Sequence, residues 1–322
     1  MSDHFADRLM DLVEQKNSRL IVGLDPDIER FPKDLLKNFG LIPDEDGKLA
    51  LNDDNFASAG QAVADFNTNI IRAVAPFVVA IKPQMAYYER LGPDGLKALQ
   101  QTILRAKEYD LMVILDAKRG DIASTSRAYA RAYFGSENQP APLPVDALTL
   151  NPYMGEEVIT PFLEMSEQGN KGIFILVRTS NPSAKLIQDI GLSEGGVFYE
   201  KVARLVSEWG EGLVGGERGY SSVGAVVGAT EPQAVSKVRE LIPQGILLLP
   251  GFGAQGAGGA EVVEAFDPGG KGAIVNSSRG IIYAYEKTGG DIGEAAAKAA
   301  ENARDEINEA LRGAGKLRES DF

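Results

Sequence analysis

Eight short apolar runs, separated by longer amphipathic segments, constrain the fold of this chain more than any other feature. The runs lie at residues 20–24, 78–82, 112–115, 147–150, 173–177, 223–227, 246–249 and 272–275. They are too apolar and too short to keep one face in water, which is typical of parallel strands covered by helices. Between them, apolar residues recur at helical spacing, as for Val63, Phe66 and Ile70 within residues 57–75. Eight strand–helix units predict an α/β fold, the (β/α)8 TIM barrel.

The length of the chain agrees with one such barrel and its insertions. A barrel of this kind takes about 250 residues, and the chain has 322, so we expect a single domain over residues 1–322. Three segments interrupt the regular unit: an acidic insertion at 31–56, a proline-rich stretch at 136–146 and a glycine-rich stretch at 210–222. We expect all three on the surface, and the last residues, 313–322, to be frayed.

The charge balance excludes several classes of partner. The chain has 46 acidic and 33 basic residues, a net charge of -13, and no stripe of lysine and arginine. That balance argues against nucleic acid and anionic membranes as partners. No segment reaches the ~18 apolar residues of a membrane span, and the charged first 17 residues lack the apolar core of a signal peptide. The expected location is therefore the cytoplasm.

Two residue types that often carry catalysis are missing or scarce. The absence of cysteine excludes disulfides, thiolate metal sites and a cysteine nucleophile. The one histidine, His4, lies near the expected start of a helix, and we expect it on the surface rather than in a catalytic site.

Charged residues lie at the carboxyl end of each of the first three predicted strands. In "LMVILDAK", Asp116 and Lys118 fall at every second position from Ile114, so both charges share its face if the strand stays extended. In "IVGLDP" and "VVAIKP", the same alternation brings Asp25 and Lys82 to that end. Any one of these charges could belong to a structural salt bridge that closes the barrel. Several charges of alternating sign at the end where barrel active sites lie favour a functional site.

The types of charge in this cluster favour one chemistry. A Schiff base needs a neutral amine, whereas Lys118 lies beside Asp116 and near Asp121, and carboxylates favour the ammonium form. A fixed carboxylate also repels an anionic substrate group, by on the order of 4 kcal/mol for charges about 4 Å apart at an effective dielectric near 20. Loss of CO2 relieves this repulsion, and the ammonium then protonates the carbanion. The cluster therefore predicts a decarboxylase.

A glycine-rich loop indicates what else the substrate carries. "PGFGAQGAGG" contains Gly251-x-Gly253-x-x-Gly256, which matches a dinucleotide-binding motif, but the next strand, "GAIVNSS", lacks the acidic residue that such a site needs. Loops after the seventh and eighth strands of a barrel commonly bind phosphate through backbone N–H groups. Arg279, in "NSSRGI" after the eighth strand, has the geometry to bind phosphate oxygens. We therefore expect a phosphorylated small molecule as the substrate.

Taken together and in this order, "GLDP", "AIKP", "LDAKRGDI", "RTSNP", "PGFGAQG" and "NSSRGI" resemble the motifs of the orotidine 5′-phosphate decarboxylases. The acidic insertion and the segments "LNPYMG" and "VVGATEP" resemble the longer bacterial form (type 2). The resemblance runs from about residue 20 to residue 283, and the D-x-K-x-x-D element with a separate upstream K-P is its most specific part. It implies conversion of orotidine 5′-phosphate to uridine 5′-monophosphate and CO2 in pyrimidine biosynthesis, with no metal and no cofactor.

The resemblance also implies catalytic roles. Lys82, Asp116, Lys118 and Asp121 would form the charged catalytic array. Lys118 would protonate C6 of the pyrimidine after CO2 leaves, and Asp116 would lie against the departing carboxylate. Asp121 and Thr125 would reach into the site of a neighbouring subunit, which implies a homodimer with shared active sites.

Further residues would bind the substrate. Asp25, with the lysine of the second strand, would hold the ribose hydroxyls, and Ser180 would contact the pyrimidine. Gln255 and Arg279 would bind the phosphate, and Gly253 would allow its close approach to the backbone.

Two alternatives remain open at this point. Another phosphosugar decarboxylase of the same barrel superfamily could carry a D-x-K-x-x-D element, but such enzymes use a metal held partly by an acidic residue after the second strand, where this chain has Lys82. A non-catalytic nucleotide-binding barrel is the other alternative, although such a protein gains nothing from a carboxylate like Asp116 that repels its ligand.

Overall fold

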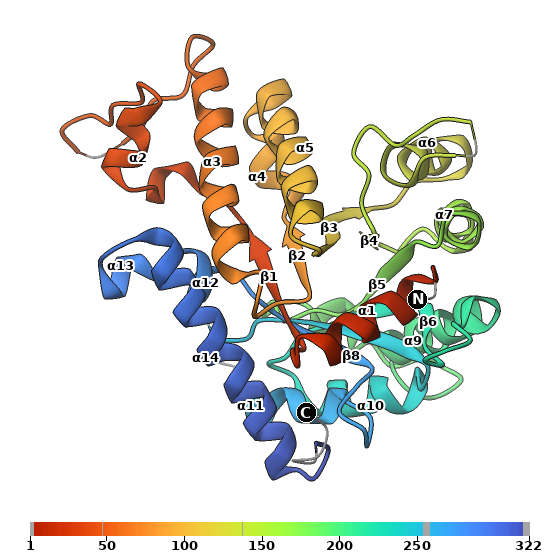
Figure 1. Ribbon diagram of the computed structural model, residues 1–322. Coiled ribbons are helices and arrows are strands. Elements are labelled where there is room, and N and C mark those ends of the chain that lie inside the picture. The colour runs from red at the N-terminus through yellow and green to blue at the C-terminus, as the bar shows by residue number, and fades with distance from the viewer. Residues whose placement is uncertain (1–2, 47, 137, 254–257, 318–322) are drawn as a thin grey trace.

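Eight parallel strands close into a barrel (Figure 1) in the computed structural model, which describes residues 3–46, 48–136, 138–253 and 258–317. Each strand pairs with the next, and the last pairs with the first. The strands are β1 (Leu20–Leu24), β2 (Ala80–Pro83), β3 (Met112–Arg119), β4 (Ala147–Leu150), β5 (Gly172–Arg178), β6 (Ser221–Val227), β7 (Gly245–Pro250) and β8 (Ala273–Ser277). The predicted (β/α)8 fold is confirmed.

The helices between the strands cover the outside of the barrel (Figure 1). They are α2 (Lys33–Asn38), α3 (Phe56–Val74), α4 (Met85–Glu89), α5 (Gly92–Glu108), α6 (Ala123–Phe134), α7 (Glu156–Gly169), α8 (Lys185–Gln188), α9 (Phe198–Gly210), α10 (Pro232–Leu241), α11 (Gly259–Val262), α12 (Arg279–Ile282), α13 (Tyr285–Thr288) and α14 (Ile292–Gly313), with short 3-10 turns η1 (Ile28–Arg30), η2 (Glu211–Leu213) and η3 (Val263–Ala265). The long α14 packs against both α3 and α11, so the last helix lies beside a helix from the first quarter of the chain.

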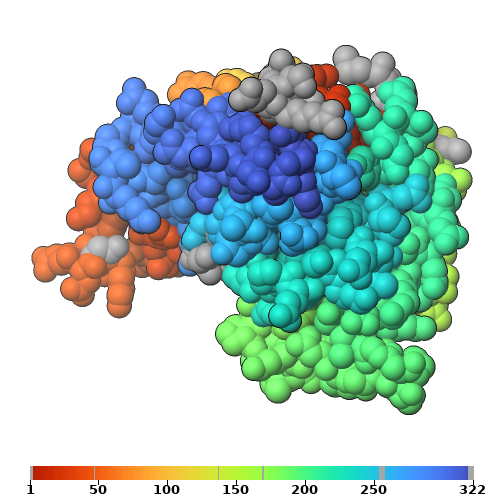
Figure 2. Space-filling view, turned by 90° about the horizontal axis from the view of Figure 1, so that it is seen from below, coloured from red at the N-terminus to blue at the C-terminus, as the bar shows by residue number. Residues whose placement is uncertain are grey.

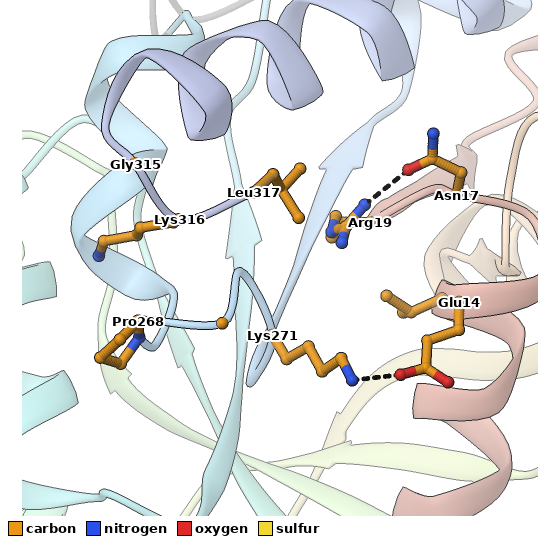
Figure 3. A pocket seen from close by; sticks show the side chains of 10 residues that line it. Glu14, Asn17, Arg19, Pro268, Lys271, Gly315, Lys316 and Leu317 are labelled. Atoms are coloured by element: carbon orange, nitrogen blue, oxygen red, sulfur yellow. Dashed lines mark hydrogen bonds and ion pairs between the residues drawn. The ribbon is translucent and has the colours of Figure 1, made fainter. Parts of the chain in front are cut away.

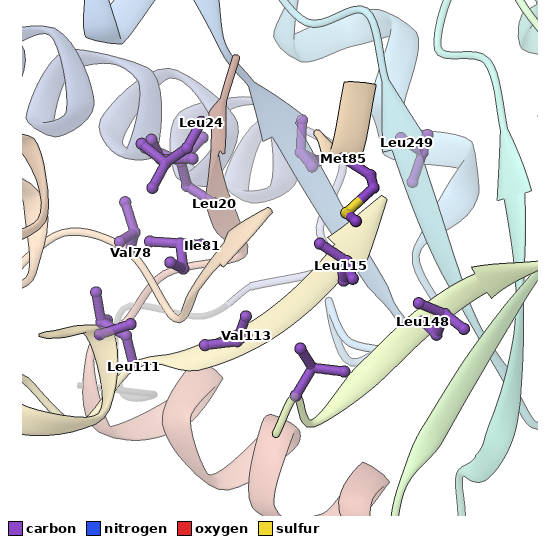
Figure 4. Packing of buried hydrophobic residues seen from close by; sticks show 14 of the residues in the cluster. Leu20, Leu24, Val78, Ile81, Met85, Leu111, Val113, Leu115, Leu148 and Leu249 are labelled. Carbon is purple, nitrogen blue, oxygen red and sulfur yellow. The ribbon is translucent and has the colours of Figure 1, made fainter. Parts of the chain in front are cut away.

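The strands contribute to two separate layers of core because alternate side chains point in opposite directions. Outward residues such as Val22, Val113 and Leu115 pack between the strands and the helices, as Figure 4 shows for part of this layer. Inward residues such as Ile21 and Ile114 fill the barrel. This parity places the next inward position of β3, Asp116, at the carboxyl end of the barrel interior.

A further helix, α1 (Phe5–Gln15), closes the opposite end of the barrel (Figure 1). Its apolar face packs against the inward residues of the strands. The Phe5 ring meets the Phe174 ring edge-on at a centroid distance of 6.1 Å. A Cβ on Gly172 would lie 2.3 Å from the Phe5 ring, so glycine there makes room for the helix. The amino-terminal end of the barrel is thus packed shut, which leaves the carboxyl end for a ligand.

The acidic insertion at 31–56 is only partly a surface segment. It projects from one side of the molecule (Figures 1 and 2), but Phe31, Leu35 and Leu36 are buried. Phe31 stacks on Phe66 of α3 with a centroid distance of 4.3 Å. The expectation of a purely surface insertion was wrong because the apolar residues within the acidic stretch cover the outer face of α3.

The glycine-rich segment at 210–222 also packs more closely than expected. The carboxylate of Asp7, buried in α1, accepts hydrogen bonds from the backbone N–H groups of Glu217 and Arg218. His4 is half-buried rather than on the surface, with its Nε2 3.0 Å from the Leu213 carbonyl and 3.1 Å from Ser222 Oγ. This segment therefore holds α1 in place at the closed end of the barrel.

The end of the chain is packed through residue 317, which corrects the expectation of fraying from residue 313. Leu317 is buried, and the Lys316 ammonium donates to the carbonyls of Val263 and Phe266. Lys316 and Leu317 border a hollow of about 530 Å³ beside α1 (Figure 3). Lys271, which also lines the hollow, pairs with Glu14 of α1.

Candidate active site

Two lysines and one aspartate meet at the carboxyl end of the barrel. The Lys82 ammonium lies 2.7 Å from Asp116 Oδ2, and the Lys118 ammonium lies 2.6 Å from Asp116 Oδ1. The side chains of Lys82 and Asp116 are only 5% and 11% exposed, whereas that of Lys118 is 43% exposed. The sequence prediction that these three charges converge is therefore met, and Lys118 is the cation that faces open space.

Two neutral groups complete the surroundings of the Asp116 carboxylate. Thr149 Oγ1 lies 2.9 Å from Oδ1, and Gln84 Nε2 lies 3.0 Å from Oδ2. Each carboxylate oxygen thus receives one ammonium and one neutral donor. A carboxylate with four donors in a buried position is held in one orientation.

The charges of this cluster control its protonation. Burial by itself would raise the pKa of Asp116, but the ammonium groups of Lys82 and Lys118 outweigh it and hold the pKa well below its ordinary value. Burial would lower the pKa of Lys82, but the carboxylates of Asp116 and Asp25 outweigh it and raise that pKa. Near neutral pH Asp116 therefore stays a carboxylate and Lys82 an ammonium.

Lys118 reaches the cluster by a route that strand parity does not describe. Its φ is +48°, in the left-handed region, so β3 does not stay extended there. The pairing of β3 with β4 shifts register between Leu115 and Arg119. Parity correctly places Asp116 inward, but a bulge in the strand, rather than simple alternation, turns the Lys118 side chain back onto Asp116.

A cavity of about 240 Å³ opens beside the charged cluster. The cluster forms one wall with Thr149, and aliphatic side chains such as Leu176, Val226 and Leu248 form another. Ser180, with its neighbours Thr179 and Asn181 in the loop after β5, closes the edge. The cavity therefore offers a partly apolar space beside fixed charges, and Ser180, which the resemblance expects to contact the pyrimidine, is among its lining residues.

Asp25 lies next to the cluster but outside that cavity lining. It follows β1, which pairs with β2 so that Gly23 lies opposite Lys82. Its carbonyl accepts a hydrogen bond from the Tyr283 hydroxyl at 2.8 Å. Its carboxylate atom Oδ1 is buried and, among the described residues, has no hydrogen-bond partner. That oxygen is available to a ligand hydroxyl.

Asp121 and Thr125 do not join the cluster of their own chain. Asp121 accepts a hydrogen bond from the neighbouring Ile122 N–H at 2.8 Å, and within the described ranges no ion pair links it to Lys82 or Lys118. Thr125 is exposed in the first turn of α6, and Ile122 between them is 55% exposed. The turn is therefore largely exposed to solvent and is not packed against the charged cluster.

The predicted phosphate-binding residues follow the last two strands. Gly253 lies after β7 with φ +74°, a conformation that favours glycine, and Arg279 begins α12 after β8 with an exposed side chain. Gln255 lies outside the described residues. Gly23 of β1 leaves room for Ser278, the residue before Arg279, because a Cβ on Gly23 would lie 1.7 Å from Ser278 Oγ.

Sequence reasoning missed two residues of the site, Thr149 and Gln84. Thr149 is the one polar residue in the buried strand "ALTL", at an inward position, and Gln84 follows the strand that carries Lys82. A polar side chain at an inward position near a strand end was the available signal.

The closed barrel and the array of paired charges at the carboxyl ends of its strands define the protein as a (β/α)8 barrel enzyme. A family model described as "Orotidine 5'-phosphate decarboxylase / HUMPS family" matches residues 18–289. The chain belongs to this family, which confirms the resemblance seen in its motifs.

Similar proteins cover nearly the whole chain. The chain is 41% identical to an orotidine 5′-phosphate decarboxylase of Rhodopirellula baltica over 88% of its own length and 89% of that protein. It is 39% identical to one of Caldicellulosiruptor saccharolyticus over 96% and 99%. A crystal structure titled as a putative orotidine-monophosphate-decarboxylase from Toxoplasma gondii matches with a TM-score of 0.79 and 34% identity, covering 98% of each chain.

Proposed function

We propose that this protein decarboxylates orotidine 5′-phosphate to uridine 5′-monophosphate and CO2, a step of pyrimidine biosynthesis. The observation that carries the proposal is the array Lys82–Asp116–Lys118, with a buried Lys82–Asp116 pair, which lines a cavity at the carboxyl end of the barrel. The family model and the names of the relatives support the same reaction.

The array suits the loss of CO2 from a pyrimidine. The substrate carboxylate would lie against Asp116, whose charge is fixed by its four donors, and the two like charges would repel each other. As the bond from C6 to the carboxylate breaks, its electron pair stays on C6 and CO2 leaves. The Lys118 ammonium stabilises that charge and donates a proton to C6, and Lys118 then takes a proton from solvent.

The ribose and the pyrimidine have candidate partners around the array. The buried Asp25 Oδ1 supports a hydrogen bond from a ribose hydroxyl, and the Lys82 ammonium, already near Asp25, would orient both. Ser180 at the edge of the cavity would contact the pyrimidine. The phosphate would be bound by Arg279 and Gln255, with Gly253 allowing its close approach.

A homodimer with shared sites is part of the proposal. Thr125 is exposed and Asp121 half-buried on a turn that also exposes Ile122. The next loop of the barrel exposes Tyr153 and Met154, so apolar side chains follow two adjacent strands. A second subunit placed there would cover this surface and receive Asp121 near its own array.

The reaction is proposed to need neither metal nor cofactor. The position after the second strand, where related metal-dependent phosphosugar decarboxylases carry an acidic residue, holds the Lys82 ammonium, which repels a divalent cation.

No helix along the described ranges is long and apolar enough to span a bilayer. The expected cytoplasmic location is a prediction that cell fractionation tests.

The decisive experiment is turnover of orotidine 5′-phosphate by the purified protein, followed by absorbance and by CO2 release. We expect turnover that survives exhaustive chelation and that is abolished in Lys118→Ala. Complete loss on chelation would favour the metal-dependent alternative. Binding of uridine 5′-monophosphate with no CO2 release would favour a non-catalytic barrel.

A further inference from the structure

Thr149 holds one hydroxyl between two parts of the charged array. Its Oγ1 accepts a hydrogen bond from the backbone N–H of Lys118 at 2.9 Å and donates to Asp116 Oδ1 at 2.9 Å. The residue is 1% exposed. A single atom thus touches both the main chain of the proposed proton donor and the carboxylate with which that donor pairs.

The directions of these two hydrogen bonds are fixed by chemistry. A backbone N–H can only donate, and an ionised carboxylate can only accept. The hydroxyl has one proton and accepts from Lys118, so its proton goes to Asp116. A valine has the same shape and no hydroxyl, so it would leave both the N–H and the carboxylate oxygen with one partner fewer.

The bulge in β3 explains why the Lys118 N–H donates its hydrogen bond to a side chain and not to a backbone carbonyl of β4. Between the pairs Leu115–Leu148 and Arg119–Leu150, four steps along β3 match two along β4, so the regular ladder is interrupted. Lys118 lies in this interval with φ +48°. A buried or half-buried N–H in a bulge needs an acceptor, and Thr149 supplies one.

We propose that Thr149 is a positioning residue for the decarboxylation, which fixes the Lys118 backbone and the Asp116 carboxylate relative to each other through one hydroxyl. This role rests on the proposed function. It predicts an effect on the chemical step more than on binding, because neither Lys118 nor Asp116 is needed to hold the ribose or the phosphate.

Three variants separate this role from a purely structural one. Thr149→Val should lower kcat for orotidine 5′-phosphate by about 10- to 100-fold, as expected for a lost hydrogen bond to a charged group. Its Kd for uridine 5′-monophosphate should change by less than about 3-fold. Thr149→Ser keeps the hydroxyl and should restore most of kcat. The matched control is Thr102→Val, since Thr102 is a buried, hydrogen-bonded threonine on α5, away from the cavity.

A second measurement does not depend on turnover. Hydrogen exchange at the Lys118 amide should accelerate in Thr149→Val and stay slow in Thr149→Ser and Thr102→Val. Wild-type kcat and unchanged exchange in Thr149→Val would overturn the inference, as would equal losses of kcat and of nucleotide affinity. A wild-type protein without turnover would overturn the proposed function and with it the role in decarboxylation, and the exchange rates would then decide only whether the Thr149 hydroxyl holds the Lys118 backbone.

Discussion

Lys82 and Asp116 come from neighbouring strands of the barrel and form an ion pair that is almost completely removed from water. The distance from Nζ to Oδ2 is 2.7 Å, and the two side chains are 5% and 11% exposed. Burying two charges carries a large desolvation cost that their attraction offsets only with good geometry. Loss of either partner should therefore affect both the stability of this end of the barrel and the chemistry of the site.

Removing the negative charge of this cluster should destabilise the fold. In Asp116→Asn two ammonium groups would lose their counterion, and we expect the free energy of unfolding at pH 7 to fall by about 3 kcal/mol. Urea unfolding measures it. The control is Asp34→Asn, because Asp34 is 95% exposed in an ion pair with Lys37, and such pairs contribute less than about 1 kcal/mol. Equal effects of the two substitutions would contradict the prediction.

The same variant predicts how stability depends on pH. The folded-state pKa of Asp116 lies below its ordinary value of 3.8, so its contribution is complete above that value and is lost as the pH falls through the lowered pKa. The difference in unfolding free energy between wild type and Asp116→Asn should be constant from about pH 5 to about pH 8 and should shrink below about pH 4. A difference that grows on acidification would show that the carboxyl is protonated in the fold.

Mixed dimers test whether Asp121 serves the partner subunit. Neither Lys118→Ala nor Asp121→Ala should be substantially active alone. Refolded as an equal mixture, half of the dimers would be hybrids with one intact site, so activity should recover to roughly a quarter of wild type. Hybrid formation is checked with a size tag on one variant. No recovery despite hybrids would place Asp121 in the site of its own subunit.

The sequence predicted the barrel and the place of its charges because both depend on local pattern. The run 20–24 coincides with β1, and 147–150 coincides with β4. Asp116 points inward since Ile114, two residues earlier, belongs to the inner core. Lys118 meets Asp116 for a different reason, because the bulge and its positive φ depend on β4 as well as on β3.

Contacts between distant segments could not be predicted in this way. The helix α1 is an amphipathic segment whose sequence does not say that it fills the barrel end, and Phe31 finds Phe66 only in the folded chain. Thr149 is one threonine in a short strand, and its hydroxyl gains a role only beside Asp116. The hydrophobic pattern of a segment shows which of its faces is buried, whereas the residues that this face contacts depend on the tertiary structure.

Gly23 should be needed for the phosphate end of the site. A Cβ there would lie 1.7 Å from Ser278 Oγ and 2.8 Å from Ser278 Cβ, so Gly23→Ala must displace the Ser278 side chain, directly before Arg279 and the start of α12. We expect KM for orotidine 5′-phosphate to rise by about 10-fold or more, since a shift of about 1 Å at a binding group is costly. Gly212→Ala is the control because nothing lies within 4 Å of its Cβ position. An unchanged KM in Gly23→Ala would show that Gly23 is not needed for phosphate binding.

A substitution at the amino-terminal end of the barrel should lower stability but leave the catalytic rate nearly unchanged. Phe5 is 1% exposed, fills the amino-terminal end and meets Phe174 edge-on. Phe5→Ala should therefore lower the free energy of unfolding by about 3–5 kcal/mol. Because the charged array lies at the carboxyl end, kcat measured well below the unfolding temperature should stay within about 2-fold of wild type. Ile42→Ala, at a side chain 78% exposed, should change neither quantity appreciably. A large loss of kcat in a folded Phe5→Ala protein would mean that packing of α1 is transmitted along the barrel interior to Asp116.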